Sequence, residues 1–117
     1  MKRRGPRTFL PLTPRVYHVL LALADGRLHG YGVILAVQSL TDSLIVLRTG
    51  TLYILLRRLL DQQLIAESDD RPEPDEDDAR RRYYTLTPLG RQVVEAESVR
   101  LQSVVAAART TLGFKRA

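Results

Sequence analysis

The sequence predicts a mainly α-helical fold, in which three helices are followed by a two-stranded β-hairpin and a long last helix. Three observations support this prediction. Apolar residues recur at helical spacing in four segments, a Thr-Pro pair stands at the start of two of them, and two short β-prone runs enclose a polar loop. The chain has 117 residues, 44% of them apolar, which suffices for one domain with a modest core.

The first half of the chain reads as a basic arm and three helices. Residues 1–12 are basic and contain prolines, so we expect a poorly ordered arm. The first helix is expected over 13–25, because a threonine cap precedes proline at the first helical position and Gly26 follows the last turn. The second helix is expected over 29–41 and the third over 49–62.

The second half predicts the hairpin and the last helix. Residues 64–67 and 82–86 read as strands, and the loop between them, 69–80, is rich in Asp, Glu and Pro. Thr87–Pro88 then starts a helix that extends to about Leu112. This order is that of a winged helix-turn-helix. We therefore divide the chain into an N-terminal arm, 1–12, a winged helix-turn-helix domain, 13–87, and a C-terminal helix and tail, 88–117.

The charge is unevenly distributed. The chain has 18 Lys and Arg against 13 Asp and Glu, and eight of the acids lie between Glu67 and Asp78. The other 105 residues carry 17 bases against 5 acids, a net charge of +12. A strongly basic body with one acidic loop is typical of nucleic-acid-binding proteins, because neutralising phosphates releases counterions.

Several function classes lack the residues they need. The chain has no cysteine and two histidines, His18 and His29, so we expect no metal site, no cofactor and no enzymatic activity. The sequence contains no run of 18 apolar residues, so it predicts no membrane span. The basic N-terminus and the apolar stretch 16–24 resemble a short export signal, but prolines and Tyr17–His18 interrupt it. We therefore expect a cytoplasmic protein.

The third helix divides into a core face and a polar face. At helical spacing Leu52 shares one face with three further leucines, and Arg57 and Arg58 lie on the opposite face. A recognition helix needs this division, because one face is anchored and the other offers donors to base edges. Thr49 and Thr51, with the N–H groups at the helix start, suit a phosphate. The alternative is that both arginines are merely solvated.

Two further features extend the predicted DNA-binding surface. The phenol of Tyr53 can bind a phosphate oxygen, and the alternative is a half-buried structural tyrosine. Arg80, Arg81 and Arg82 lead into the second strand, where a wing typically meets backbone phosphate or the minor groove. In the alternative reading these three bases balance the acidic loop, which we expect to be solvated.

The last helix has an apolar stripe longer than a small domain can cover. The stripe consists of Val94, Leu101, Val105, Ala108 and Leu112. A second copy of the chain is the simplest partner for it, so we expect a homodimer. The alternative is that this helix packs back along the first helix of the same chain.

A series of short motifs carries a family resemblance. It comprises Leu12–Thr13–Pro14, Leu20–Leu23, His29–Gly32, Gly50–Tyr53, Leu56, Arg58, Leu59, Leu64–Ile65, Arg82–Tyr84, Leu86–Thr87 and Gly90. In this order and spacing it resembles the PadR-type (phenolic acid decarboxylase regulator) transcriptional regulators, in their shorter type. The resemblance implies winged-helix repressors that dimerise through the C-terminal helix, some of which respond to phenolic acids, drugs or antibiotics. It also implies that Thr51 and Tyr53 lie near DNA.

Three positions depart from the family pattern. Ile54 stands where a proline or small residue is usual, and Leu60 and Gln63 stand where Glu and Gly are usual. At the end of the third helix, glycine can adopt the left-handed backbone conformation without strain, whereas glutamine in that conformation costs about 1 kcal/mol.

These observations together predict a sequence-specific, double-stranded DNA-binding transcriptional repressor, acting as a homodimer on a pseudo-palindromic operator. A small aromatic or drug-like effector is expected at the dimer interface, where Phe9 and Tyr17, with Val94 and Leu101, are candidate contacts. The alternative function is a winged-helix protein–protein interaction module without specific DNA binding.

Overall fold

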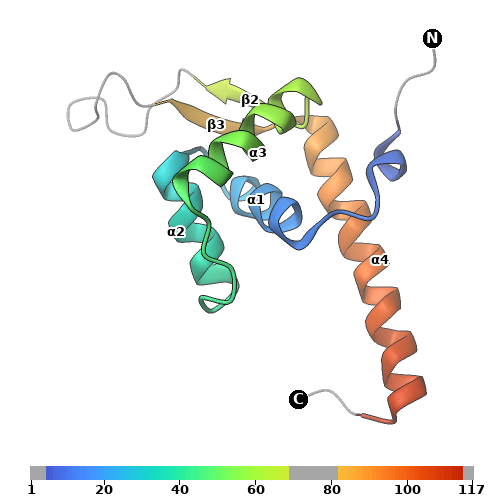
Figure 1. Cartoon of the computed structure of the whole chain (residues 1–117). Coiled ribbons are helices and arrows are strands. Elements are labelled where there is room, and N and C mark those ends of the chain that lie inside the picture. The colour runs from blue at the N-terminus through green and yellow to red at the C-terminus, as the bar shows by residue number, and fades with distance from the viewer. Residues whose placement is uncertain (1–4, 69–81, 115–117) are drawn as a thin grey trace.

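A computed structural model describes residues 5–68 and 82–114, where helices pack beside a small antiparallel sheet (Figure 1). The elements in order are η1 (Pro6–Phe9, a 3-10 helix), α1 (Pro14–Ala24), β1 (Leu28–His29), α2 (Gly30–Leu40), α3 (Thr49–Asp61), β2 (Ile65–Ser68), β3 (Tyr83–Leu86) and α4 (Pro88–Leu112). The four predicted helices and the two strands of the wing are confirmed, with bounds shifted by about one residue.

Hydroxyl caps begin the helices at both Thr-Pro pairs. Thr13 Oγ1 accepts a hydrogen bond from the Val16 N–H at 3.2 Å, and Thr87 Oγ1 accepts one from the Gly90 N–H at 3.0 Å. The proline in each pair lacks an N–H that the first turn would leave unpaired, so both pairs are efficient helix starts. The sequence therefore determines these two boundaries locally.

The sheet has three strands in the order β1-β3-β2, all antiparallel. In the wing, Ile65 lies opposite Leu86 and Ser68 lies opposite Tyr83. The sequence does not predict β1, because two residues are too short to show an alternating pattern. β1 is a strand only because β3 supplies its partner.

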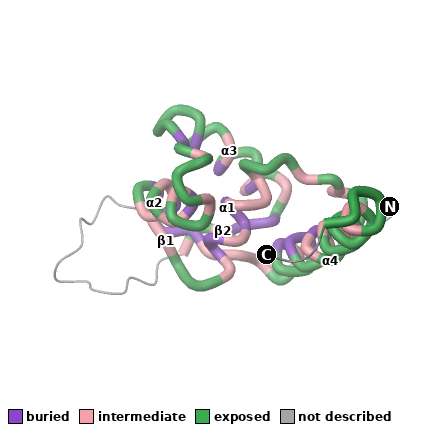
Figure 2. The backbone as a smooth tube through the Cα atoms, turned by 90° about the horizontal axis from the view of Figure 1, so that it is seen from below, coloured by how far each residue is buried: buried purple, intermediate pink, exposed green. Residues whose placement is uncertain are grey.

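The core lies where α1, α2, α3 and the first half of α4 face one another, and Figure 2 shows the buried residues on the inner sides of these elements. Its buried apolar residues include Val19, Leu20, Leu23, Val33, Val37, Leu52, Leu56, Leu59, Leu64, Ile65, Tyr84, Val93 and Val94. The leucines that the sequence assigns to the inner face of α3 are therefore in the core, with Leu55 partly buried.

The N-terminal segment differs from the expectation of a poorly ordered arm, which is wrong for residues 5–12. Residues 6–9 form η1, which packs against α4, and Phe9 and Leu10 are partly buried against the core. The Leu12 N–H donates to Glu97 Oε2 at 2.7 Å. Apolar burial and this hydrogen bond attach the segment to α4. Residues 1–4 lie outside the described part of the chain.

The helix α4 belongs to the domain at one end and extends away from it at the other (Figure 1). Val93, Val94 and Glu97 are buried, whereas most residues after Arg100 are exposed. Two hydrogen bonds join the first half to α1: Arg91 Nη2 donates to the Ala24 carbonyl at 2.9 Å, and the hydroxyls of Tyr17 and Ser98 lie 2.8 Å apart.

Candidate nucleic-acid interface

The first turn of α3 is open to an anion. The N-cap position, Arg48, makes no side-chain cap hydrogen bond, and the first turn contains no acidic residue. Thr49, Gly50 and Thr51 are exposed. The N–H groups of a first helical turn have no partner within the helix, and the helix dipole makes this end positive. The two threonines predicted to contact phosphate therefore lie at the positive end of α3, where a phosphate group binds favourably.

The exposed face of α3 presents the two predicted base-reading arginines. Arg57 and Arg58 are both exposed, while Leu52, Leu56 and Leu59 hold the opposite face in the core. Ile54 is also exposed on this outer side. A guanidinium has the fork of donors that matches the O6 and N7 acceptors of guanine in the major groove. The structure thus brings these two side chains to the outer surface of an anchored helix.

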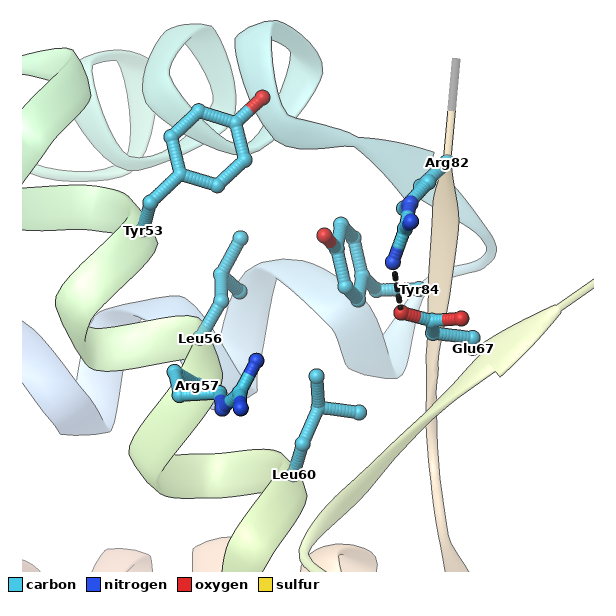
Figure 3. Close-up of a pocket in the computed structure, with 7 residues that line it drawn as sticks. All are labelled: Tyr53, Leu56, Arg57, Leu60, Glu67, Arg82 and Tyr84. Atoms are coloured by element: carbon cyan, nitrogen blue, oxygen red, sulfur yellow. Dashed lines mark hydrogen bonds and ion pairs between the residues drawn. The ribbon is translucent and has the colours of Figure 1, made fainter. Parts of the chain in front are cut away.

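Arg82 lies at the start of the second wing strand and is already paired. Its Nη1 donates to Glu67 Oε1 at 3.0 Å across the hairpin, which Figure 3 marks with a dashed line. The predicted contacts Arg80 and Arg81 lie outside the described residues, as does the acidic loop. Of the three wing arginines, only Arg82 is therefore placed by the structure.

A cleft of about 340 Å³ separates α3 from the wing. It is lined by Tyr53, Leu56, Arg57, Leu60, Glu67, Arg82 and Tyr84 (Figure 3). Tyr53 is half exposed, and a methyl group at Gly30 would lie 2.8 Å from its hydroxyl oxygen. The phenol therefore packs over the start of α2 while the rest of the side chain faces the cleft. This position is compatible with a structural role for Tyr53 and with a contact to phosphate.

The cleft is electrostatically mixed. Burial raises the pKa of the Tyr84 phenol above its usual value, and the nearby Tyr53 and Glu67 raise it further, against the opposing effect of Arg82. Tyr84 is therefore a neutral hydroxyl at physiological pH. The carboxylate of Glu67 is the acidic group among the described residues that line this cleft. Sequence reasoning missed Glu67, because the strand register that places it beside Arg82 is a tertiary feature.

The structure corrects the predicted dimer face. Val94 is buried in the core of its own chain, so it is unavailable to a second copy and is not part of the dimer face. Val105 and Leu112 are exposed, and Leu101 and Ala108 are partly exposed. Val104 is a further exposed residue on this side of α4, and its position three residues after Leu101 could have identified it from the sequence.

The predicted effector contacts are engaged within the chain. Phe9 is partly buried against the core, and the Tyr17 hydroxyl pairs with Ser98. A groove of about 330 Å³ does lie between the N-terminal segment and α4, but other residues line it. They are Arg7, Leu10, Ala96, Val99, Arg100 and Ser103.

Two absences hold for the part of the chain that the structure describes. Among residues 5–68 and 82–114, no three His, Cys, Asp or Glu side chains gather as metal ligands would. Within the same ranges, every helix is too short or too polar to cross a membrane.

A curated protein is similar in sequence to much of this chain. It is an uncharacterised 37.1 kDa protein in transposon TN4556 of Streptomyces fradiae, 40% identical over 80 residues. The match covers 68% of this chain and 21% of that protein. The chain therefore spans about a fifth of the length of this relative.

Solved structures share the fold. A PadR family regulator from Clostridium difficile has a TM-score of 0.69 at 23% identity, covering 86% of this chain and 99% of that one. Bacillus subtilis PadR in complex with operator DNA has a TM-score of 0.57 at 22% identity, covering 69% and 44%. Bordetella bronchiseptica BpsR, whose DNA binding is regulated by 6-hydroxynicotinic acid, has a TM-score of 0.62 at 27% identity, covering 84% and 65%.

The family assignment rests on a match over most of the chain. The sequence model described as the transcriptional regulator PadR-like family matches residues 19–96, from the middle of α1 through the wing into α4. Members of this family are transcriptional regulators and not enzymes, in agreement with the expectation from the sequence. The chain belongs to the PadR-like family of transcriptional regulators.

Proposed function

We propose that the chain represses transcription by binding double-stranded DNA in a sequence-specific manner. The observation that supports this most directly is the outer face of α3, where Arg57 and Arg58 are exposed on a helix anchored by three buried leucines. In this proposal α3 enters the major groove, the arginines read base edges, and Thr49, Thr51 and Arg82 contact phosphates. The fold it shares with the Bacillus subtilis regulator bound to operator DNA supports this docking. The proposal also places the chain in the cytoplasm.

The proposal includes a homodimer formed through α4. The second half of this helix extends beyond the core and exposes Val104, Val105 and Leu112. Pairing this surface with its own copy removes apolar area from water, and the proposed dimer has its two α3 helices on one side. Two recognition helices about one helical turn apart, roughly 34 Å, would read a pseudo-palindrome.

The proposal also includes a small aromatic or drug-like effector. The groove between the N-terminal segment and α4 offers apolar walls from Leu10, Ala96 and Val99 and the guanidinium group of Arg7, while the Arg100 guanidinium at its edge is engaged by Glu97. A ligand bound beside α4 would change the spacing of the two α3 helices and weaken DNA binding. The ligand-regulated DNA binding of the Bordetella bronchiseptica protein supports this part by analogy.

Selection from fragmented genomic DNA, followed by titration of the purified chain, tests the function. The enriched duplex and a scrambled duplex of the same composition are compared at several salt concentrations. We expect the enriched duplex to bind at least about tenfold more tightly, with two chains per site. Equal affinities, with a steep salt dependence for both, would show non-specific phosphate binding and contradict the proposal.

A second candidate function is supported by exposed apolar side chains outside the α3 face. Tyr31 and Leu35 are exposed one turn apart on α2, and Leu44 and Val46 are exposed on the segment that follows it. Exposed apolar side chains suit a protein partner better than DNA. If the chain is a protein–protein interaction module, no genomic fragment will be enriched in the selection.

A further inference from the structure

An acidic side chain lies where the proposed function calls for bases. Glu67 shares the cleft between α3 and the wing with Arg57 and Arg82, and with the hydroxyls of Tyr53 and Tyr84. Both walls of this cleft belong to elements that would face the phosphate backbone. A carboxylate in this position repels phosphate, so its presence needs an explanation.

The geometry shows which base the carboxylate engages. Glu67 lies in β2 opposite Tyr84, and Arg82 immediately precedes β3. Arg82 Nη1 donates to Glu67 Oε1 at 3.0 Å, and the only dashed line in Figure 3 joins these two residues, while Arg57 stands on the α3 wall. The free protein therefore presents Arg82 as one half of a neutral pair.

This pair can be opened at little cost. The side chains of Arg82 and Glu67 are 71% and 47% exposed. Water and salt screen an ion pair at such a surface, so its partners exchange readily when a stronger anion approaches. A backbone phosphate held close to the wing is such an anion, whereas a phosphate at a distance is not.

We propose that Glu67 is a specificity-determining residue of the DNA-binding surface, which keeps Arg82 paired until α3 is seated on its operator. This inference rests on the proposed function. Binding to arbitrary DNA depends on phosphate contacts, so a neutralised Arg82 and a nearby carboxylate weaken it. On the operator, base contacts by α3 fix the wing against the backbone, and a phosphate replaces Glu67 as the partner of Arg82.

The test compares Glu67→Gln with wild type in the full chain, on a random-sequence duplex and on the enriched duplex. For the random duplex we expect affinity to rise about three- to tenfold at low salt, with a log–log salt slope steeper by about one. Affinity for the enriched duplex should rise less, so sequence preference falls. Glu95→Gln, which removes an exposed acid of α4 outside the cleft, is the matched control and should leave the preference unchanged.

Two results would overturn the inference. If Glu95→Gln raises the random-duplex affinity as much as Glu67→Gln does, net charge alone explains the change. If the gain persists in the double variant Glu67→Gln with Arg82→Gln, the carboxylate acts without releasing Arg82. The single variant Arg82→Gln gives an independent check, because it should weaken binding to the enriched duplex more than to the random one.

Failure of this inference is distinguishable from failure of the proposed function. The proposed function is judged on wild type alone, by its preference for the enriched duplex. The release of Arg82 in Glu67→Gln is judged on differences between variants on the random duplex, which requires no operator, and the loss of sequence preference is judged by comparing the variants on both duplexes.

Discussion

Gln63 is a residue at which the chain adopts an unfavourable backbone conformation. It follows α3 with a φ of 63°, in the left-handed region, and the next N–H, of Leu64, bonds to the Leu59 carbonyl at 3.0 Å. This geometry ends a helix well when the left-handed residue is glycine, because a Cβ atom crowds the following carbonyl. The departure from the family pattern noted in the sequence therefore has a physical consequence.

Gln63→Gly is expected to raise the free energy of unfolding by about 1 kcal/mol, because it removes this crowding. Urea unfolding followed by circular dichroism measures the change. Gln62→Gly is the matched control, since Gln62 has a φ of −82° and gains nothing from glycine. It should lower the free energy of unfolding by about 0.5–1 kcal/mol. Changes of the same sign in both variants would refute the conformational explanation.

Gly90 is a position where no larger residue fits. A Cβ atom there would lie 2.0 Å from the Leu64 carbonyl oxygen, a backbone atom that cannot turn aside. Gly30 is also close to a neighbour, but its Cβ would meet the Tyr53 hydroxyl at 2.8 Å, the far end of a side chain. The two glycines therefore differ in what must move.

Gly90→Ala is expected to lower the free energy of unfolding by about 3 kcal/mol or more, because α4 must shift from the α3–β2 turn. Gly30→Ala should cost less than about 1 kcal/mol, since Tyr53 can rotate and alanine favours the helix. Thermal unfolding of both variants compares them. Equal losses of stability in the two variants would mean that the close approach of α4 to Leu64 is not the reason why residue 90 must be glycine.

At the scale of elements, one buried carboxylate joins the N-terminal segment to α4. Glu97 is 1% exposed and accepts hydrogen bonds from the Leu12 N–H at 2.7 Å and from Arg100 Nη2 at 3.0 Å, with a further ion pair to Arg100 Nε. The hydrogen bonds from Arg100 hold the pKa of this carboxyl below its usual value, although burial opposes them. The folded state therefore favours the charged form.

This attachment predicts a pH dependence. Because the folded-state pKa lies below the unfolded one, the stabilisation is fully present above the unfolded pKa of about 4.3 and is lost as pH falls toward the folded pKa. Glu97→Gln should lower stability at pH 7 by about 1–3 kcal/mol and reduce the loss on acidification. Urea unfolding at a series of pH values from about 3 to 7 measures the stability at pH 7 and its loss on acidification. Identical pH profiles for Glu97→Gln and Glu95→Gln would contradict this assignment.

The outer face of α3 gives the next prediction. Arg57→Ala and Arg58→Ala should each weaken operator binding by about 1–3 kcal/mol and relax sequence preference, if their guanidinium groups read base edges. Arg15→Ala removes the same charge from the exposed start of α1 and serves as control. Titrations on the enriched and scrambled duplexes separate the outcomes. Loss of affinity without loss of preference would reassign both arginines to phosphates.

At the scale of the whole molecule, the helices and the wing could be predicted from the sequence because local chemistry determines them. Thr13 and Thr87 mark helix starts, and the spacing of Leu52, Leu56 and Leu59 identifies the inner face of α3. The exposed position of Arg57 and Arg58 follows from the same periodicity.

Features that depend on distant partners could not be predicted. The strand β1 exists through β3, the N-terminal segment is ordered through Glu97, and the Glu67–Arg82 pair depends on the hairpin register. The predicted place of Val94 on the dimer face is wrong for a related reason. It continues the apolar stripe of α4, and only the packed structure shows that the stripe changes from core to surface along the helix.

The last prediction concerns the part of α4 that lies beyond the core. Val105 is 42% exposed on the proposed dimer face, while Val99 is 62% exposed and lines the groove beside the N-terminal segment. Val105→Glu should convert dimers into folded monomers, because it buries a charge in the interface. Val99→Glu adds the same charge away from that face and should leave dimers intact. Analytical ultracentrifugation measures the oligomeric state of both variants.

Dimer loss should also reduce DNA binding, which links assembly to the proposed function. A dimer contacts both half-sites together, and this linkage multiplies the affinity of a single α3 by about a hundredfold or more. Val105→Glu should therefore bind the enriched duplex with an affinity close to that for one half-site, with circular dichroism confirming an intact fold. If Val105→Glu stays dimeric and Val99→Glu dissociates, the partner packs against the opposite side of α4, and the two α3 helices cannot have the arrangement proposed here.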